Sequence, residues 1–355
     1  MTSSWYAHDR DRTWTTERPS SDASEFHRGL DGYAPTPLVD LPRFAAEFGV
    51  GHVLAKDESQ RLGLPAFKAL GASWAVHRAI ADHDGELPVT IVTATDGNHG
   101  RAIARWARTL GQRASVVIPS GVHPDAVQAI RDEGAAVTLV DGSYDDAVHA
   151  AADIASAADG ILVQDTAWPG YEDIPGWIVQ GYSTLFTEID EQLRDAGLDP
   201  VDLLVVPVGV GSLLQAAITH HRHEADGPAI VSVEPEAAAF VAASLAAGEP
   251  VTVETVPTVM AGLNCGTPSS LAWPHMQRGL DAAVTVDDEV VVMAARDLAR
   301  AGVPAGPCGA ASLAALRVAL GDDTDERRRH LGLRADSVVV LLVTEGAAAN
   351  PLPED

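Results

Sequence analysis

Short runs of β-branched and aliphatic residues alternate with amphipathic stretches along most of the chain. The first series predicts strands at 89–94, 115–118, 137–140 and 161–163, separated by helices at 100–110, 124–133 and 144–157. Short apolar runs bounded by turn residues are typical of buried strands. Strands and helices that alternate at this spacing form parallel sheets with right-handed crossovers.

A second series follows the long segment 170–199. It predicts strands at 203–207, 230–233 and 337–343, and a helix at 212–221. Two series of this kind indicate two α/β domains. We expect a ligand in the crevice between them, at the carboxyl ends of the strands.

The composition is that of a globular protein with a large core. Of the 355 residues, 46% are hydrophobic and 21% are charged, which suits two domains. The sequence contains no apolar run long enough to cross a membrane, and residues 1–30 contain no hydrophobic run of the kind found in signal peptides. We therefore expect a cytoplasmic protein.

The chain is strongly acidic and poor in cysteine. Fifty acidic residues against 24 basic ones give a formal net charge of -26, which disfavours nucleic acid and anionic membranes as partners. Adaptation to high salt and nucleotide bias in the host genome both explain this composition. Cys265 and Cys308 are too few for a disulfide framework, so we expect reduced thiols.

Lysine is almost absent from the chain. Lys68 stands near the start of a predicted helix at 66–80, and the one other lysine is Lys56. Arginine keeps its proton in proteins, whereas a lysine in an apolar pocket can lose it and form a Schiff base. A surface lysine with a packed stem is the alternative. The segments that follow in the chain favour the reactive amine.

Two glycine-containing turns follow predicted strands. The first offers a ligand the carboxylate of Asp96 and the amide of Asn98, although Asp96 also suits a helix N-cap. The second opens a helix, and its backbone amides favour an anion. This second turn consists of Gly209, Val210, Gly211 and Ser212. Because Leu214 replaces the third glycine of the dinucleotide motif, a lone phosphate is the better ligand.

Two further strand ends carry polar side chains. Asp165 opens an aromatic loop, which provides either a second carboxylate or an ordinary surface turn. Thr344 follows the last predicted strand. Three histidines, His220, His221 and His223, have no cysteine or carboxylate at metal-ligand spacing. We therefore predict a solvated helix end there and no metal site.

A reactive lysine, a phosphate turn, an asparagine loop and a hydroxyl at a strand end are what a pyridoxal phosphate site requires. The chain resembles the fold type II, tryptophan synthase β-like, pyridoxal phosphate enzymes, and within them the diaminopropionate ammonia-lyase family. The resemblance covers residues 33–351 and is carried by segments 56–61, 66–71, 96–100, 165–171, 174–175 and 180–182.

The resemblance implies two three-layer α/β domains with mostly parallel sheets. The smaller one, 60–185, would carry the asparagine loop. The larger one, 1–59 with 186–355, would carry the phosphate turn and the partner of the ring nitrogen. The family likeness also implies a homodimer.

The resemblance assigns roles to individual residues. Lys68 would form the Schiff base, Asn98 would meet the ring hydroxyl, and Thr344 would meet the ring nitrogen. Asp96 and Asp165 would transfer protons and bind the second ammonium of the substrate. The residues that would hold the phosphate are Gly209, Val210, Gly211 and Ser212.

The implied reaction is the α,β-elimination of a small amino acid, 2,3-diaminopropionate, to pyruvate and two molecules of ammonia. Three alternatives stay open: a serine or threonine dehydratase-like deaminase, a β-eliminase of another β-substituted alanine, and a binding protein without turnover. Two departures from the family pattern bear on the substrate. Gly-Pro-Cys-Gly replaces Gly-Glu-Ser-Gly at 306–309, and Ala-Ala-Ala-Asn replaces an acidic continuation at 347–350.

Overall fold

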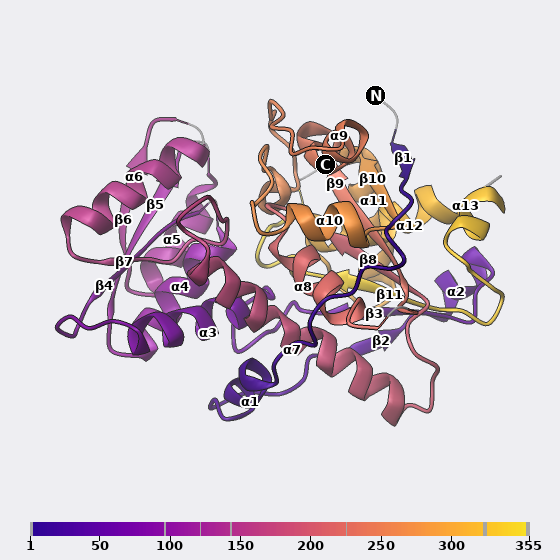
Figure 1. Cartoon of the computed structure of the whole chain (residues 1–355), viewed down its shortest axis with the longest axis horizontal. Coiled ribbons are helices and arrows are strands. Elements are labelled where there is room, and N and C mark those ends of the chain that lie inside the picture. Colours follow the sequence, from indigo (N-terminus) through magenta and orange to yellow (C-terminus); the bar gives the residue numbers. More distant parts are fainter. Residues whose placement is uncertain are drawn as a thin grey trace.

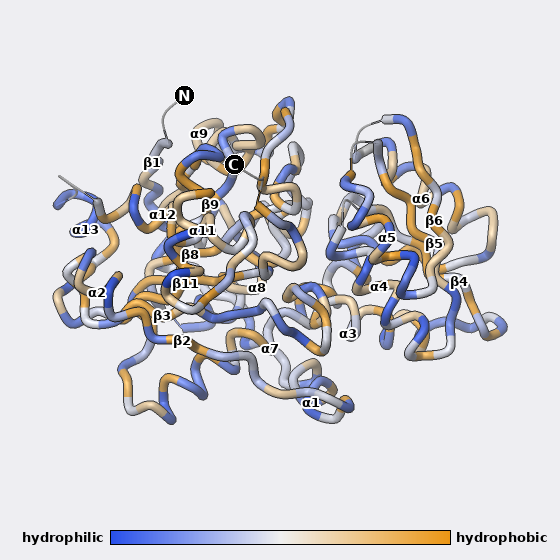
Figure 2. Tube along the Cα trace, turned by 180° about the vertical axis from the view of Figure 1, so that it is seen from behind, coloured by the Kyte–Doolittle hydropathy of each residue, from blue (hydrophilic) through white to orange (hydrophobic). Residues whose placement is uncertain are grey.

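The computed structural model describes residues 3–95, 97–120, 122–142, 144–224, 226–321 and 325–352 of the chain. The strands of this part form two sheets, one of seven strands and one of four, which lie in separate lobes of the molecule (Figure 1). Figure 2 shows hydrophobic residues along the central strands of both sheets. The predicted α/β fold with mostly parallel sheets is confirmed.

The larger sheet has the order β1-β10-β9-β8-β11-β3-β2. Its strands are β1 (Ser4–Ala7), β2 (Leu38–Asp40), β3 (His52–Asp57), β8 (Leu203–Pro207), β9 (Ala229–Pro235), β10 (Ala282–Val286) and β11 (Val338–Val343). The five inner strands pair in parallel, and the two edge strands, β1 and β2, pair antiparallel with β10 and β3.

Two hydrophobic layers cover the larger sheet because successive side chains of a strand point to opposite faces. In β11, Val338, Val340 and Leu342 belong to one cluster, and the residues between them belong to the other. The first cluster includes residues of α7 (Asp173–Asp195), α8 (Ser212–His221), α9 (Phe240–Ala247) and α10 (Trp273–Gly279). The second includes residues of α2 (Pro42–Phe48), α11 (Asp288–Arg300) and α12 (Pro307–Leu320).

The smaller sheet has the order β6-β5-β4-β7, and all of its strands are parallel. Its strands are β4 (Thr90–Ala94), β5 (Arg113–Pro119), β6 (Ala136–Val140) and β7 (Ile161–Leu162). The helices of this lobe are α3 (Lys68–Ala81), α4 (Asn98–Thr109), α5 (Pro124–Asp132) and α6 (Tyr144–Ala157). Residues of α6 pack on one face of the sheet, and residues of α3, α4 and α5 pack on the other.

The strands and helices predicted from the two series are present, within a few residues at their ends. The hydrophobic pattern missed β1, β2, β3 and β10, as well as the helix α7 in the segment 170–199. The remaining short elements are α1 (Asp22–Arg28), η1 (Glu236–Ala238), η2 (Ala261–Leu263) and α13 (Asp325–His330). In the described ranges, every helix is too short or too polar to span a bilayer.

The proposed domain boundaries stay a proposal. The first, between 59 and 60, follows β3, whereas the second, between 185 and 186, falls inside α7. This helix runs from the lobe of the smaller sheet to below the larger one (Figure 1). A single helix therefore belongs to both lobes and joins them.

The second lysine is part of a buried network on α7. Lys56 is fully buried, and its Nζ donates to Glu188 Oε2 at 2.6 Å. Arg61 donates to both oxygens of Glu188 and also pairs with Glu58, so the network contains two cations and two carboxylates. Burial alone would raise the pKa of Glu188, but Arg61 and Lys56 outweigh it and lower the pKa to about 2.

We expect Glu188→Ala to lower the free energy of unfolding by about 3–5 kcal/mol, because it leaves Lys56 and Arg61 buried with a single carboxylate. Urea unfolding followed by circular dichroism measures the change. The matched control is Glu191→Ala on the same helix, which removes an exposed pair with Arg28 and should cost less than about 1 kcal/mol. Equal losses in the two variants would contradict this account.

Candidate active site

One pocket collects residues from the carboxyl ends of strands in both sheets, as the strand order predicts. Thr95 and Asn98 follow β4, Asp165 follows β7, and Thr344 follows β11. Its lining consists of Phe67, Lys68, Thr95, Asn98, His99, Tyr144, Asp165, Pro207, Val208, Gly209, Val210, Gly211, Ser212, Leu213, Gly262, Leu263, Cys265, Cys308, Thr344 and Glu345.

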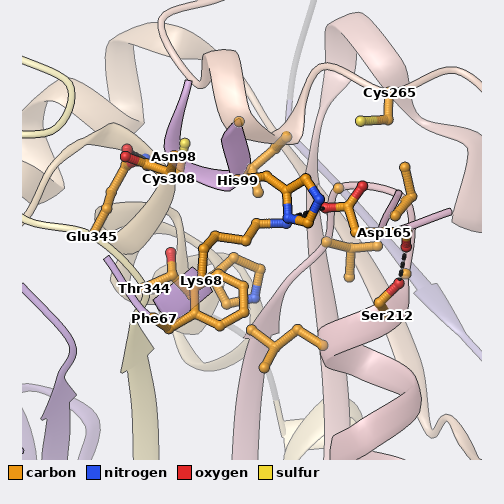
Figure 3. A pocket seen from close by; sticks show the side chains of 18 of the residues that line it. Phe67, Lys68, Asn98, His99, Asp165, Ser212, Cys265, Cys308, Thr344 and Glu345 are labelled. Atoms are coloured by element: carbon orange, nitrogen blue, oxygen red, sulfur yellow. Dashed lines mark hydrogen bonds and ion pairs between the residues drawn. The ribbon is translucent and has the colours of Figure 1, made fainter. Parts of the chain in front are cut away.

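Lys68 is the first residue of α3, and its side chain extends across the pocket to Asp165, beside the ring of His99 (Figure 3). The Lys68 Nζ donates to Asp165 Oδ2 at 2.6 Å. Burial lowers the pKa of the Lys68 amine, but the Asp165 carboxylate outweighs burial, so the net pKa is raised. The sequence predicted an amine that can lose its proton. In this arrangement, the ion pair keeps it protonated.

Asp165 is the matching anion. Its side chain is only 6% exposed, and burial by itself would raise its pKa. Lys68 and then His99 outweigh burial and lower the pKa of Asp165 to about 2. The Ser212 hydroxyl donates to the backbone carbonyl of Asp165 at 2.6 Å, which ties this loop to the start of α8. The carboxylate is therefore ionised at neutral pH and held in a fixed position.

The turn between β8 and α8 forms one wall of the pocket. Gly211 has φ +107, a conformation that favours glycine, and an added Cβ would lie 2.9 Å from Ala272 Cβ and still closer to the end of Met276. At Gly209, a Cβ would lie 2.9 Å from the Gly262 carbonyl oxygen. The first amides of a helix lack partners within that helix, so the turn and α8 together present donors to an anion.

Glu345 is a buried carboxyl group at the opposite wall. It accepts hydrogen bonds from Asn98 Nδ2 at 2.6 Å and from the Cys308 amide at 3.2 Å. Burial raises the pKa of Glu345. The neighbouring Thr344 hydroxyl is buried and has no hydrogen-bond partner among the described residues, so it is available to a ligand that supplies one.

Every predicted site residue that the structure describes lines this pocket. These residues are Lys68, Asn98, Asp165, Gly209, Val210, Gly211, Ser212 and Thr344. Asp96, the remaining one, lies outside the described residues. Sequence reasoning assigned no role to His99, Tyr144 or Glu345. His99 and Glu345 directly follow Asn98 and Thr344 in the chain, so their positions were the one available signal.

The two departures from the family pattern differ in their relation to the pocket. Cys308, from 306–309, is in the lining, whereas the described lining includes no residue of 347–350. The Asn350 amide instead donates to the Val259 carbonyl at 2.8 Å. Cys265 and Cys308 both carry reduced thiols, as predicted.

The histidines at the end of α8 do not form a solvated helix end, and that prediction is wrong. His220 pairs with Asp190 at 2.7 Å and packs near Phe186, and its side chain is only 12% exposed. The described part of the chain contains no group of three or more histidine, cysteine or acidic side chains that could hold a metal ion.

Comparison with known proteins identifies the family. Residues 30–345 match the family described as pyridoxal-phosphate dependent enzyme. The chain belongs to this family. It is 35% identical to the diaminopropionate ammonia-lyase of Salmonella typhimurium over 93% of this chain and 89% of that protein. It is 32% identical to an L-threonine dehydratase of Mycobacterium leprae over 79% of this chain and 64% of that protein.

Solved structures agree with the sequence relatives. A crystal structure of diaminopropionate ammonia-lyase from Escherichia coli in complex with D-serine superposes with a TM-score of 0.89 and 32% identity, covering 97% of this chain and 94% of that one. A crystal structure of a bacterial threonine deaminase has a TM-score of 0.76 and 25% identity, and covers 95% of this chain and 100% of that one. The predicted resemblance is confirmed.

Pyridoxal phosphate is the cofactor of this pyridoxal-phosphate-dependent enzyme, as predicted. The pocket fits it on three observations. A lysine amine enters the pocket from α3. A glycine-containing turn, too crowded for side chains, precedes a helix N-terminus where a phosphate can bind. The buried Thr344 hydroxyl has no hydrogen-bond partner in the described structure.

We expect Gly211→Ala to weaken pyridoxal phosphate binding by roughly tenfold or more, because a non-glycine residue costs about 1–2 kcal/mol in the left-handed region. The loop would relax away from the conformation that presents its amides. Titration of the apoprotein with cofactor, followed by absorbance, measures the affinity. Gly197→Ala is the control, since Gly197 also has a positive φ, +69, but meets nothing within 4 Å. Equal affinities of the two variants would refute a role for the turn in binding.

Proposed function

We propose that this protein is an ammonia-lyase that converts 2,3-diaminopropionate to pyruvate and two molecules of ammonia by α,β-elimination, with consumption of one water. The observation that carries the proposal is the buried carboxylate of Asp165, which holds a primary ammonium, that of Lys68, inside the pocket at 2.6 Å. The relatives named diaminopropionate ammonia-lyase support it further, because they match this chain over nearly its whole length.

Particular residues of this chain would hold the cofactor. Lys68 would bind it through the amine, Asn98 would meet the ring hydroxyl, and Thr344 would meet the ring nitrogen. The phosphate would lie against the turn formed by Gly209, Val210, Gly211 and Ser212. When bound, pyridoxal phosphate supplies the electron sink for removal of the α-proton. Thr344 is neutral, so it donates no full charge to this end of the pocket.

Asp165 would select the leaving group. An amine is a poor leaving group unless it is protonated, and an anion beside the β-nitrogen keeps that nitrogen cationic. Because the pKa of Asp165 is lowered to about 2, its charge persists throughout the neutral range. The hydroxyl of serine carries no charge and gains less from the same carboxylate. The site therefore favours diamino acids over hydroxy acids.

Lys68 would exchange partners during this cycle. A substrate with a second ammonium competes with Lys68 for Asp165, and the amine of Lys68 loses the anion that raises its pKa. A lysine without that partner in a buried site gives up its proton more readily. Binding of the substrate thus frees a base in the pocket. Asp96 is proposed as the second proton-transfer carboxylate on its sequence motif alone.

We also propose that the protein is a cytoplasmic homodimer. The reduced thiols of Cys265 and Cys308 suit a reducing compartment, and the dimer rests on the family resemblance. A serine or threonine dehydratase-like reaction is the second candidate function. It is favoured by Cys308, which brings a departure from the family pattern into the lining of the pocket.

The deciding assay measures pyruvate release from the holoenzyme offered 2,3-diaminopropionate and serine at equal concentrations. We expect a strong preference for the diamino acid, because only its second ammonium pairs with Asp165. A preference for serine would assign the dehydratase reaction to the same pocket. Lack of turnover of either substrate by cofactor-loaded protein would favour a binding protein.

We expect Asp165→Asn to reduce kcat/KM for 2,3-diaminopropionate by roughly 10- to 100-fold more than for β-chloroalanine, the effect of one hydrogen bond to a charged group. Chloride needs no ammonium subsite to depart, so β-chloroalanine reports on the rest of the machinery. The ratio of the two kcat/KM values is the measured quantity. Equal losses on both substrates would mean that Asp165 serves only Lys68.

A further inference from the structure

His99 is a buried side chain in the pocket with no role in the account so far. It lies in the first turn of α4, and its side chain is 5% exposed. Figure 3 shows its ring beside the Lys68 amine and the Asp165 carboxylate. Both of its ring nitrogens face groups whose chemistry can be assigned.

The hydrogen bond of one ring nitrogen fixes the tautomer. His99 Nε2 lies 3.1 Å from the Val163 carbonyl oxygen. A carbonyl only accepts hydrogen bonds, so Nε2 carries a proton. Burial lowers the pKa of His99, which keeps the ring neutral. A neutral imidazole has one ring proton, and Nδ1 therefore presents a lone pair.

The lone pair on Nδ1 has no donor within the described structure. Nδ1 is buried and makes no hydrogen bond there. A buried polar atom without a partner is rare in proteins and costs free energy, so it calls for a ligand that supplies the missing partner. The ligand must carry a hydrogen-bond donor.

The position next to this lone pair already suits an ammonium. Asp165 Oδ2 lies 3.9 Å from His99 Nδ1, and the Lys68 ammonium binds to that same oxygen at 2.6 Å. The other oxygen, Oδ1, faces the Tyr144 hydroxyl at 3.5 Å. The Asp165 carboxylate thus turns Oδ2 toward His99, and two acceptors converge on one place.

We infer that His99 Nδ1 and Asp165 Oδ2 together form the subsite for the second ammonium of the substrate. This inference rests on the proposed function and adds a specificity-determining residue to it. Acceptors 3.9 Å apart are close enough for a single nitrogen to bond to both at about 2.8–3.0 Å. An ammonium has three protons and satisfies both acceptors, whereas a hydroxyl has one and leaves the other unsatisfied. The pair therefore rejects serine.

Two substitutions separate this role from a structural one. His99→Asn keeps an acceptor near the Nδ1 position but loses the donor to Val163. His99→Gln reaches the Nε2 position and keeps that donor, but loses the acceptor at Nδ1. Pyruvate release by each cofactor-loaded variant is measured with 2,3-diaminopropionate and with β-chloroalanine, and cofactor absorbance and circular dichroism check the fold.

We expect His99→Gln to lower kcat/KM for 2,3-diaminopropionate roughly 10- to 100-fold while β-chloroalanine turnover changes less than about threefold, since one hydrogen bond to a charged group is lost. His99→Asn should retain most of the preference for the diamino acid. The reverse order, with His99→Asn impaired on both substrates and His99→Gln normal, would assign His99 to holding Val163 and overturn the inference.

A second measurement does not depend on turnover. Nitrogen-15 chemical shifts of the histidine rings, assigned with His99→Gln, report which nitrogen of His99 carries the proton. A proton on Nε2 alone supports the inference, and a proton on Nδ1 overturns it. If the wild-type protein turns over β-chloroalanine but not 2,3-diaminopropionate, the proposed function fails. A wild-type preference for the diamino acid that survives in His99→Gln sinks the inference alone.

Discussion

The close packing of α3 against α7 is the contact on which the rest of the molecule depends. A Cβ at Gly71 would lie 2.6 Å from the Tyr182 ring, and one at Gly181 would lie 2.7 Å from the Leu70 carbonyl oxygen. Only glycine allows the two helices to approach so closely. The contact fixes the start of α3, and with it the amine of Lys68, relative to a helix that reaches both lobes.

Electrostatics follow from this arrangement. An acidic chain with formal net charge -26 keeps both of its lysines inside and gives each a carboxylate partner at 2.6 Å. The partners of Lys56 lie in a closed network that includes Arg61, and such a network stabilises a single arrangement of side chains. Lys68 faces a pocket, so its partner Asp165 is available to a ligand. The same type of ion pair is structural at one lysine and exchangeable at the other.

The pocket walls divide the chemistry. Backbone groups and small residues of the turn after β8 suit an anion, whereas Asp165 and His99 provide acceptors for a cation. Glu345 faces Asn98 on the far wall and holds its amide by a bond of 2.6 Å. A ligand with a phosphate at one end and an ammonium at the other would therefore bind in one orientation.

The sequence by itself determined the α/β fold, most strands and the turns that carry the site, because these depend on local periodicity and on glycine and polar residues at strand ends. It missed β3, whose apolar run is short and ends in Lys56 and Asp57, and α7, whose contacts with both lobes are recognised only in space. The tertiary structure alone decided that Lys68 meets Asp165, 97 residues away, and that Asn98 meets Glu345, 247 residues away. It also decided the proton position on His99, because a tautomer depends on which carbonyl the ring faces, and no local pattern records that.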